Sequence, residues 1–113
     1  MKHIKAVIKP EKLDDVKVAL KKAGCSGIMV TEIEGHGRQG GISQQWRGEK
    51  FELDLLPKIV VDIVVTDADT DRIIGVILDS AKTGGDKGDG KIFVYDVERV
   101  IRIRTGEEGE SAI

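Results

Sequence analysis

Apolar residues follow two periodicities along the chain, and these predict the secondary structure. Short segments in which valine and isoleucine alternate with polar residues or run together are typical of strands. They occur at residues 4–8, 27–35, 56–65 and 91–97. Apolar residues three or four positions apart predict one helix at residues 11–23 and another that starts at Asp69 or Thr70. Gly24 and Gly84 stand where the two helices are expected to end, because glycine readily adopts the left-handed conformation of a C-terminal cap.

The order of these elements, βαββαβ, is that of the α+β ferredoxin-like sandwich. Right-handed crossovers would place both helices on the same face of a four-stranded sheet. The strand at 56–65 is largely apolar on both of its faces, so the second face of the sheet should be covered as well. A large exposed aliphatic face marks an interface. We therefore expect an oligomer whose subunits pack through their sheets.

A long polar segment separates the second and third expected strands, and we interpret it as an effector loop at about residues 37–55. It contains several glycines together with Arg38, Arg47, Lys50 and the single tryptophan, Trp46. Loops of this length in a small domain are usually functional or disordered. We expect a mobile arm that meets a partner or closes over a ligand. The alternative is a surface excursion without a function.

Composition and charge restrict the class of protein. A length of 113 residues suits one domain, residues 1–113. With 18 basic and 20 acidic residues the net charge is −2, which gives no reason to expect a nucleic acid or an anionic membrane as the main partner. A single cysteine, Cys25, cannot form an internal disulfide and fits a cytoplasmic location. No apolar run approaches the roughly twenty residues of a transmembrane helix, so we expect no membrane insertion.

The glycine-rich turn at about residues 82–91 is a candidate phosphate-binding element. Its G-x4-G-K pattern resembles a P-loop superficially, but Ile92 replaces the required Ser or Thr, and a strand follows instead of a helix. Small residues nevertheless let backbone N–H groups approach an anion closely, and Lys87 and Lys91 add positive charge. The alternative is an ordinary turn from helix to strand.

The C-terminal segment, residues 98–113, is expected to contain an arginine-bearing strand. Arg102 and Arg104 alternate with isoleucines, so a strand would send both guanidinium groups to one face. Two arginines at this spacing can bind neighbouring oxygens of a polyphosphate. The alternative is a solvated arginine edge paired with the acidic tail at 107–110. We expect the end of the tail to be disordered.

No group of residues is typical of catalysis. His3 and His36 lack neighbours at metal-ligand spacing, and Cys25 has no evident base beside it. The residues alone therefore indicate a binding protein with no catalytic residue and not an enzyme.

Taken together, these segments resemble the PII family of nitrogen-regulatory signal-transduction proteins, over residues 4–113. The motifs that carry the resemblance are IKPxKLDD at 8–15, VTE at 30–32, GxGRQ at 35–39, RG at 47–48, LPK at 56–58, GDGKIFV at 88–94 and VIRIRTGEE at 100–108. So many motifs in the same order are highly specific.

The resemblance implies a homotrimer with nucleotide sites in the clefts between subunits. ATP and ADP would compete there, and 2-oxoglutarate would join when MgATP is bound. The residues implied for ATP or ADP are Met29, Gly37, Arg38, Gln39, Val64, Gly88, Asp89, Gly90, Lys91, Arg102 and Arg104. Those implied for 2-oxoglutarate are Gln39, Gly40, Gly41, Lys58 and Gly88.

Particular roles follow from the same resemblance. Gly88, Gly90 and Lys91 would hold the phosphates together with Arg38 and with Arg102 and Arg104 of a neighbouring subunit, whereas Met29 and Val64 would line the adenine pocket. Gln39 would be a ligand of Mg2+, and Lys58 would pair with a carboxylate of 2-oxoglutarate.

The long loop would contact the target through Trp46, Arg47 and Phe51. The partners implied are an ammonium transporter, whose pore Arg47 would enter, glutamine synthetase or another nitrogen-metabolism protein. The protein would act in the cytoplasm and, when a transporter recruits it, at the inner face of the membrane.

The chain departs from the family pattern in places that bear on regulation. Phe51 stands where many bacterial relatives have a modified tyrosine, and Glu49 stands where cyanobacterial relatives have a phosphorylated serine. Control by ligands alone is therefore expected. Gly40 replaces a common lysine at the base of the loop, and the turn at 83–91 looks one residue longer than usual.

Two other functions remain as alternatives. An RNA-recognition module has the same βαββαβ order, but it requires stacking aromatics, and only Phe93 and Tyr95 lie close to one another here. A small ATP-using enzyme would need a base beside the phosphates, for which Asp86 and Asp89 are the obvious candidates.

Overall fold

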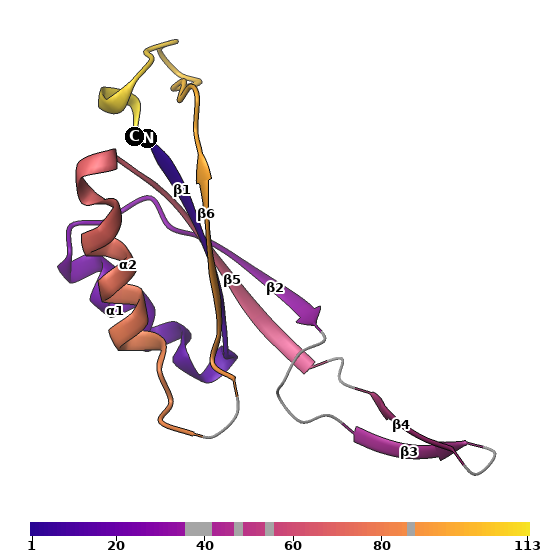
Figure 1. The fold of residues 1–113 in the computed structure, drawn as a ribbon. Coiled ribbons are helices and arrows are strands. Elements are labelled where there is room, and N and C mark those ends of the chain that lie inside the picture. The colour runs from indigo at the N-terminus through magenta and orange to yellow at the C-terminus, as the bar shows by residue number, and fades with distance from the viewer. Residues whose placement is uncertain (36–41, 47–48, 54–55, 86–87) are drawn as a thin grey trace.

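The computed structural model describes residues 1–35, 42–46, 49–53, 56–85 and 88–113 (Figure 1). The main sheet consists of β1 (Lys2–Ile8), β2 (Met29–Gly35), β5 (Leu56–Val65) and β6 (Gly90–Asp96). The helices are α1 (Leu13–Lys22) and α2 (Asp67–Ala81), with short 3-10 helices at Pro10–Lys12 and Glu110–Ala112. Over the described ranges, no helix has both the length and the apolar character needed to cross a membrane.

The four strands of the main sheet are antiparallel and lie in the order β2-β5-β1-β6. Figure 1 shows α1 and α2 side by side on one face of this sheet. Both observations confirm the predicted ferredoxin-like α+β fold, since this strand order is the one that two right-handed crossovers produce.

The core lies between the helices and the sheet. Alternate residues of β1 and β5 point toward the helices, as the period of a strand requires. The buried strand residues are Ile4, Ala6, Ile8, Ile59, Val61, Ile63 and Val65, and the buried helix residues are Val16, Leu20, Ile73, Ile77 and Ala81. These are the aliphatic positions on which the sequence prediction rested.

The opposite surface of the sheet, here called the open face, mixes apolar and ionisable side chains. By register it carries His3, Lys5, Val7, Met29, Thr31, Ile33, Lys58, Val60, Asp62, Val64, Lys91, Phe93 and Tyr95. Met29, Phe93 and Tyr95 are about half exposed. Their exposure agrees with the expected association through this face, which itself stays a prediction.

The glycine predicted to cap α1 has that role. Gly24 has a φ of 92°. Its N–H donates to the carbonyl of Lys21 over 3.0 Å, and the N–H of Cys25 donates to the carbonyl of Leu20 over 3.0 Å. This pair of bonds is a Schellman motif, which satisfies carbonyl groups that the end of the helix leaves without partners.

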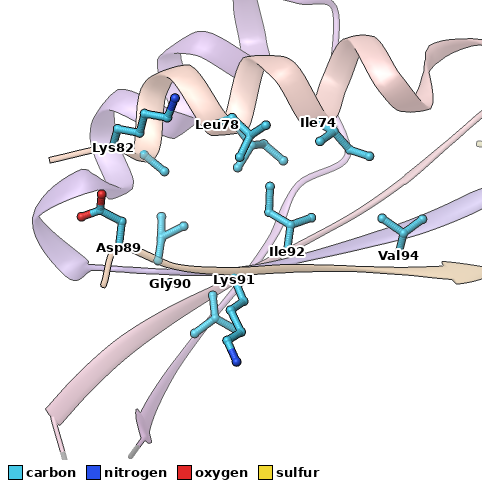
Figure 2. Close-up of a pocket in the computed structure, with 12 residues that line it drawn as sticks. Ile74, Leu78, Lys82, Asp89, Gly90, Lys91, Ile92 and Val94 are labelled. Atoms are coloured by element: carbon cyan, nitrogen blue, oxygen red, sulfur yellow. The ribbon is translucent and has the colours of Figure 1, made fainter. Parts of the chain in front are cut away.

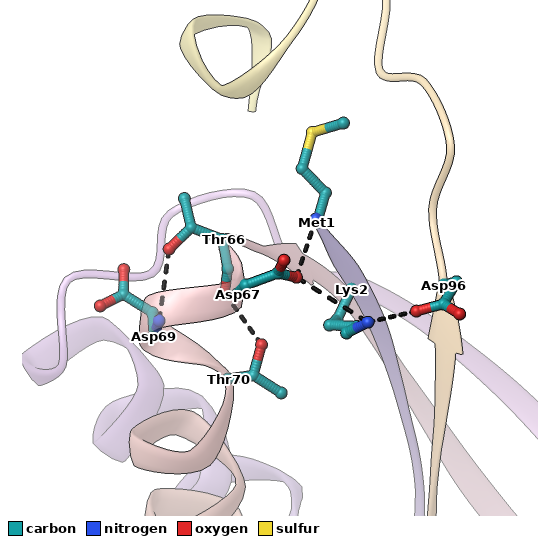
Figure 3. Close-up of polar contacts among 7 residues, drawn as sticks. All are labelled: Met1, Lys2, Thr66, Asp67, Asp69, Thr70 and Asp96. Carbon is teal, nitrogen blue, oxygen red and sulfur yellow. Dashed lines mark hydrogen bonds and ion pairs between the residues drawn. The ribbon is translucent and has the colours of Figure 1, made fainter.

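The predicted start and end of α2 were wrong. The helix starts at Asp67 because Thr66, the first residue after β5, acts as its N-cap: the Thr66 hydroxyl accepts a hydrogen bond from the N–H of Asp69 over 3.3 Å (Figure 3). Asp69 and Thr70 lie inside the helix. At the other end the chain becomes extended at Lys82, so Gly84, with a φ of 74°, belongs to the following turn and does not end the helix.

Thr66→Ala should lower the free energy of unfolding by about 1 kcal/mol, the usual cost of losing an N-cap side chain. Urea denaturation followed by circular dichroism measures this change. Thr66→Ser keeps the capping oxygen and should remain close to wild type. An equal loss in both variants would contradict the capping role.

Ion pairs hold the N-terminus of the chain at the start of α2. The amino group of Met1 lies 2.9 Å from the carboxylate of Asp67, and Lys2 contacts both Asp67 and Asp96 (Figure 3). The hydrogen bond from the N-terminal amine is the main cause that lowers the pKa of Asp67 below its ordinary value. These exposed contacts join the start of β1 to the start of α2 and the end of β6.

The predicted arginine strand in residues 98–113 was wrong, as was the expectation of a disordered end. After β6 the chain reverses: Ile101 forms an isolated bridge with Glu108, and the tail ends in a 3-10 helix. Gly106 and Gly109 have φ values of 71° and 96°, a conformation that glycine adopts without strain and that turns the chain back.

The segment expected as a loop at 37–55 contains two strands. The strands β3 (Ile42–Trp46) and β4 (Glu49–Leu53) pair in an antiparallel hairpin, with Ile42 opposite Leu53 and Trp46 opposite Glu49. The mobile arm of the sequence interpretation therefore includes regular structure.

Candidate functional site

A polar network holds the turn between α2 and β6. The carboxylate of Asp89 accepts hydrogen bonds from the Thr83 hydroxyl at 2.5 Å and from the Thr83 backbone N–H at 3.3 Å. The Lys9 ammonium lies 3.4 Å from this carboxylate and donates to the Thr83 hydroxyl oxygen over 3.3 Å. The hydrogen bonds from Thr83, followed by the charge of Lys9, lower the pKa of Asp89 below its ordinary value. Asp89 is therefore an ionised anchor of the turn.

Gly90 is required by the close packing of β6 on β1. Its φ is +113°, and a Cβ atom there would lie 1.8 Å from the carbonyl oxygen of Val7. The family resemblance implied only a phosphate-binding role for Gly90. The structure gives this glycine a role in the fold that does not depend on any ligand.

Three lysines, Lys9, Lys58 and Lys91, lie at the end of the sheet where β1 ends and β5 and β6 begin; we call this region the lysine end. Lys91 pairs with Val7 in the register, and its side chain points away from α2, whereas Asp89 lies on the α2 side (Figure 2). Lys58, at the start of β5, is 6% exposed. Burial, followed by the positive charge of Lys9, lowers the pKa of Lys58. Clustered cations and a glycine-rich turn are suited to an anion that carries several charges.

A pocket of about 360 Å³ lies on the helix side of the lysine end, between α2 and β6 (Figure 2). Its walls are mainly aliphatic, and Lys82 and Asp89 line its polar end. An aliphatic wall does not suit phosphate groups. The open face, which carries Lys58 and Lys91, has the charge that an anion would require.

The residues predicted to line the adenine pocket are together, but at the other end of the sheet. Met29 and Val64 line a pocket of about 370 Å³ with Val100, Ile113 and neighbouring residues. Val64 lies six positions after Lys58 in β5, a span of about 20 Å at about 3.3 Å per residue. The turn that carries Arg102 lies beyond the end of β6, at this same end of the sheet (Figure 1). One chain thus divides the predicted nucleotide residues between opposite ends of its sheet.

Comparison with known proteins decides the family. A protein-family model described as "Nitrogen regulatory protein P-II" matches residues 1–107. The chain belongs to the P-II family. It is 57% identical to the "Nitrogen regulatory protein P-II" of Pasteurella multocida over the full length of both chains. It is 54% identical to the "Nitrogen regulatory protein P-II 2" of Methanothermobacter thermautotrophicus, over all of this chain and 97% of that one.

The P-II relatives also include the "Nitrogen regulatory protein P-II 1" of Escherichia coli K12, which is 53% identical over the full length of both chains. Membership confirms the resemblance recognised from the motifs. It supports a role in nitrogen signal transduction and a regulatory rather than an enzymatic character.

Within this P-II chain the two predicted arginines have different surroundings. The guanidinium of Arg102 donates to the carboxylate of Glu107 and to the carbonyl of Ser111, each over 2.9 Å. These contacts match the alternative stated for this segment from the sequence, in which an exposed arginine pairs with the acidic tail. Arg104 is exposed. Binding of a phosphate by Arg102 would require it to exchange these contacts for the ligand.

Several P-II residues named from the sequence lie outside the described residues. These are Gly37, Arg38, Gln39, Gly40, Gly41, Arg47, Asp86 and Lys87. Trp46 and Phe51 belong to β3 and β4, of which the backbone alone is described. In the part of the chain that the structure does describe, no three His, Cys, Asp or Glu side chains gather as they would around a metal ion.

Sequence reasoning missed two residues of the polar network at the turn between α2 and β6, Lys9 and Thr83. Lys9 was part of a recognised motif, but it received no role, because its partners are 74 and 80 positions away in the chain. Strand pairing relates Lys9 to Lys58: Lys9 follows Ile8, and Ile8 pairs with Ile59, the neighbour of Lys58. The sequence alone does not give this pairing.

Proposed function

We propose that this P-II protein senses nitrogen status by binding ATP or ADP and, together with MgATP, 2-oxoglutarate. The sites would be three clefts between the subunits of a homotrimer. Bound ligands would change the conformation of the segment at 37–55, through which the protein would regulate an ammonium transporter, glutamine synthetase or another nitrogen-metabolism protein. It would act in the cytoplasm, and at the inner membrane face when bound to a transporter.

The observation that carries this proposal is the division of the site between the two ends of the sheet. Each chain has a cationic end, with Lys58 and Lys91, and an end with an apolar pocket lined by Met29 and Val64. A nucleotide has the matching parts, a polyphosphate and an apolar base. Two neighbouring copies could line one cleft with opposite ends, which accounts for the expected oligomer and for arginines that reach across from a neighbour.

The residues suit the ligands chemically. Lys91 and the N–H groups of a glycine-rich turn are donors for phosphate oxygens, and Lys58 supplies a cation for a carboxylate. Gln39 is the residue assigned to Mg2+, and that ion would neutralise part of the charge between the phosphates and the carboxylate. In this account Asp89 contributes its backbone and its contact with Lys9, not a carboxylate ligand.

An ATP-using enzyme is less well supported. A general base works best when its pKa is close to the working pH. The pKa of Asp89 is lowered, and its oxygens already accept hydrogen bonds from Thr83. Asp86, the other candidate base, lies outside the described residues.

An RNA-binding module has one favourable feature, the exposed pair Phe93 and Tyr95 on the open face. The ring of Tyr95 lies 5.5 Å from that of His3 and 6.0 Å from the Lys5 ammonium. Association through the open face would cover both aromatics, so the proposed trimer and RNA stacking exclude each other.

Calorimetric titration tests the proposal directly. MgATP and ADP should each bind, and 2-oxoglutarate should bind when MgATP is present but not when it is absent. Sedimentation should give the mass of a trimer, with up to one nucleotide per chain. A monomer that binds no nucleotide would overturn the proposal. Nucleotide binding without a response to 2-oxoglutarate would restrict the function to sensing of ATP and ADP.

A further inference from the structure

A groove of about 580 Å³ lies between the second half of α1 and the segment that leads into β2; we call it the α1 groove. Its described lining includes two lysines, Lys17 and Lys21, and three apolar side chains, Val18, Cys25 and Ile28. Cys25 and Ile28 pack against the hydrophobic core, so the fold fixes the floor of the groove. Because α1 lies on the helix side of the sheet (Figure 1), association through the open face would not cover it.

The charge of the α1 groove has one sign. Lys17 and Lys21 are four positions apart in α1, so they lie on the same side of the helix, about 6 Å apart along its axis at about 1.5 Å per residue. Like charges at this spacing destabilise a helix. In the described part of the chain neither ammonium forms an ion pair, whereas Lys12, just before the helix, pairs with Asp15 at 3.3 Å. An acidic partner would supply the missing negative charge.

The other two pockets have a different charge pattern. Lys82 and Asp89 both line the pocket between α2 and β6, and Asp69 and Arg72 both line the pocket that contains Met29. Each of these pockets therefore carries both signs of charge. Of the three, the α1 groove alone has cations without a carboxylate in its described lining.

The shape of the α1 groove suits a peptide segment. Val18 is 52% exposed and both lysines are exposed, so the groove is open to solvent along the helix. A small-molecule site, in contrast, encloses most of its ligand. In an extended peptide alternate side chains point to the same side and lie about 6.6 Å apart, at about 3.3 Å per residue. Two carboxylates at alternate positions thus match Lys17 and Lys21, and an aliphatic residue two positions further would lie toward the apolar floor.

We propose that the α1 groove binds an acidic segment of a partner protein, with two carboxylates on Lys17 and Lys21 and an aliphatic side chain on the apolar floor. This surface goes beyond the proposed function, because it lies outside the lysine end and requires no nucleotide. An anionic membrane is a poorer match. Recognition of a membrane surface by charge uses clusters of four or more basic residues, and α1 also exposes Asp14 and Asp15.

A dye-labelled peptide, Gly-Glu-Ser-Glu-Ser-Leu-Gly with blocked ends, tests the proposal by fluorescence anisotropy with the nucleotide-free protein. We expect saturable binding. The double substitution Lys17→Gln and Lys21→Gln should weaken it about fivefold, the effect of losing two exposed ion pairs. Val18→Gln should weaken it about threefold, because part of the apolar contact is lost. All three positions are exposed, and circular dichroism establishes that the variants are folded.

The matched control is Lys22→Gln. Lys22 is an exposed lysine of the same helix that does not belong to the described lining of the groove. This variant should bind the peptide with the wild-type affinity. Peptides with glutamine for both glutamates, or with serine for the leucine, should bind wild type more weakly.

Cys25, the single cysteine, reports whether the peptide occupies the α1 groove. Saturating peptide should slow alkylation of its thiol by N-ethylmaleimide, measured by mass spectrometry. The double variant, at the same peptide concentration, should show less protection. Absence of peptide binding, equal binding by wild type and the double variant, or unchanged alkylation of Cys25 would overturn the proposal. Binding to phosphatidylserine vesicles that only the double variant loses, without peptide binding, would overturn it in favour of a membrane surface.

Discussion

Gly90→Ala should destabilise the protein by about 4 kcal/mol or more, the range in which single substitutions disrupt a defined structural feature. The added Cβ would lie 1.8 Å from the carbonyl oxygen of Val7, and φ would have to remain near +113°, a region that alanine avoids. The clash involves backbone, which cannot rotate away as a side chain could. Relief requires β6 to separate from β1 at the lysine end.

Urea denaturation measures this loss, and two other glycines provide controls. Gly75 lies within α2 with no atom near the position of an added Cβ, so Gly75→Ala should stabilise the protein by about 1 kcal/mol through helix propensity. Gly84 has a φ of +74° and open space around it, so Gly84→Ala should show the backbone cost alone, about 1 kcal/mol. A Gly90→Ala protein as stable as Gly84→Ala would contradict the close packing.

Lys58→Met should weaken binding of 2-oxoglutarate about 100-fold, because it removes a buried charged partner and leaves the ligand carboxylate without it. The same substitution should raise the free energy of unfolding. Burial of a lysine disfavours its charged form, as the lowered pKa of Lys58 indicates, and methionine fills a similar volume without that cost. Loss of ligand binding together with gain of stability would distinguish a functional lysine from a structural one.

The pH dependence of stability gives an independent check on Lys58. Its pKa in the folded protein lies below the ordinary value of 10.5 that applies to the unfolded chain, so between the two values the unfolded chain binds more protons. The free energy of unfolding of wild type should therefore rise as pH increases through this interval. In Lys58→Met the contribution of Lys58 to this rise should disappear, whereas Lys17→Met, at an exposed lysine of α1, should keep it. If the free energy of unfolding varied with pH in the same way in Lys58→Met as in wild type, this would argue against the lowered pKa of Lys58.

The sequence by itself determined the order of the elements, the class of fold and the family. Strand periodicity placed β5 at 56–65, the bounds that the structure has, because both faces of a strand in the middle of the sheet must be apolar. Gly24 was recognisable as a cap because a Schellman motif depends on residues within one turn of a helix. The motifs of the P-II family were likewise continuous segments that can be read without a fold.

Tertiary structure decided what depends on residues that are distant in the chain. Lys9 meets Thr83 only because β1 and the turn after α2 end at the same edge of the core, and the need for glycine at position 90 arises from Val7 on the neighbouring strand. The division of the nucleotide residues between two ends of the sheet also depends on register and not on local sequence. Local patterns specify elements through short-range periodicity, but contacts between elements depend on how those elements pack, and the site is built from such contacts.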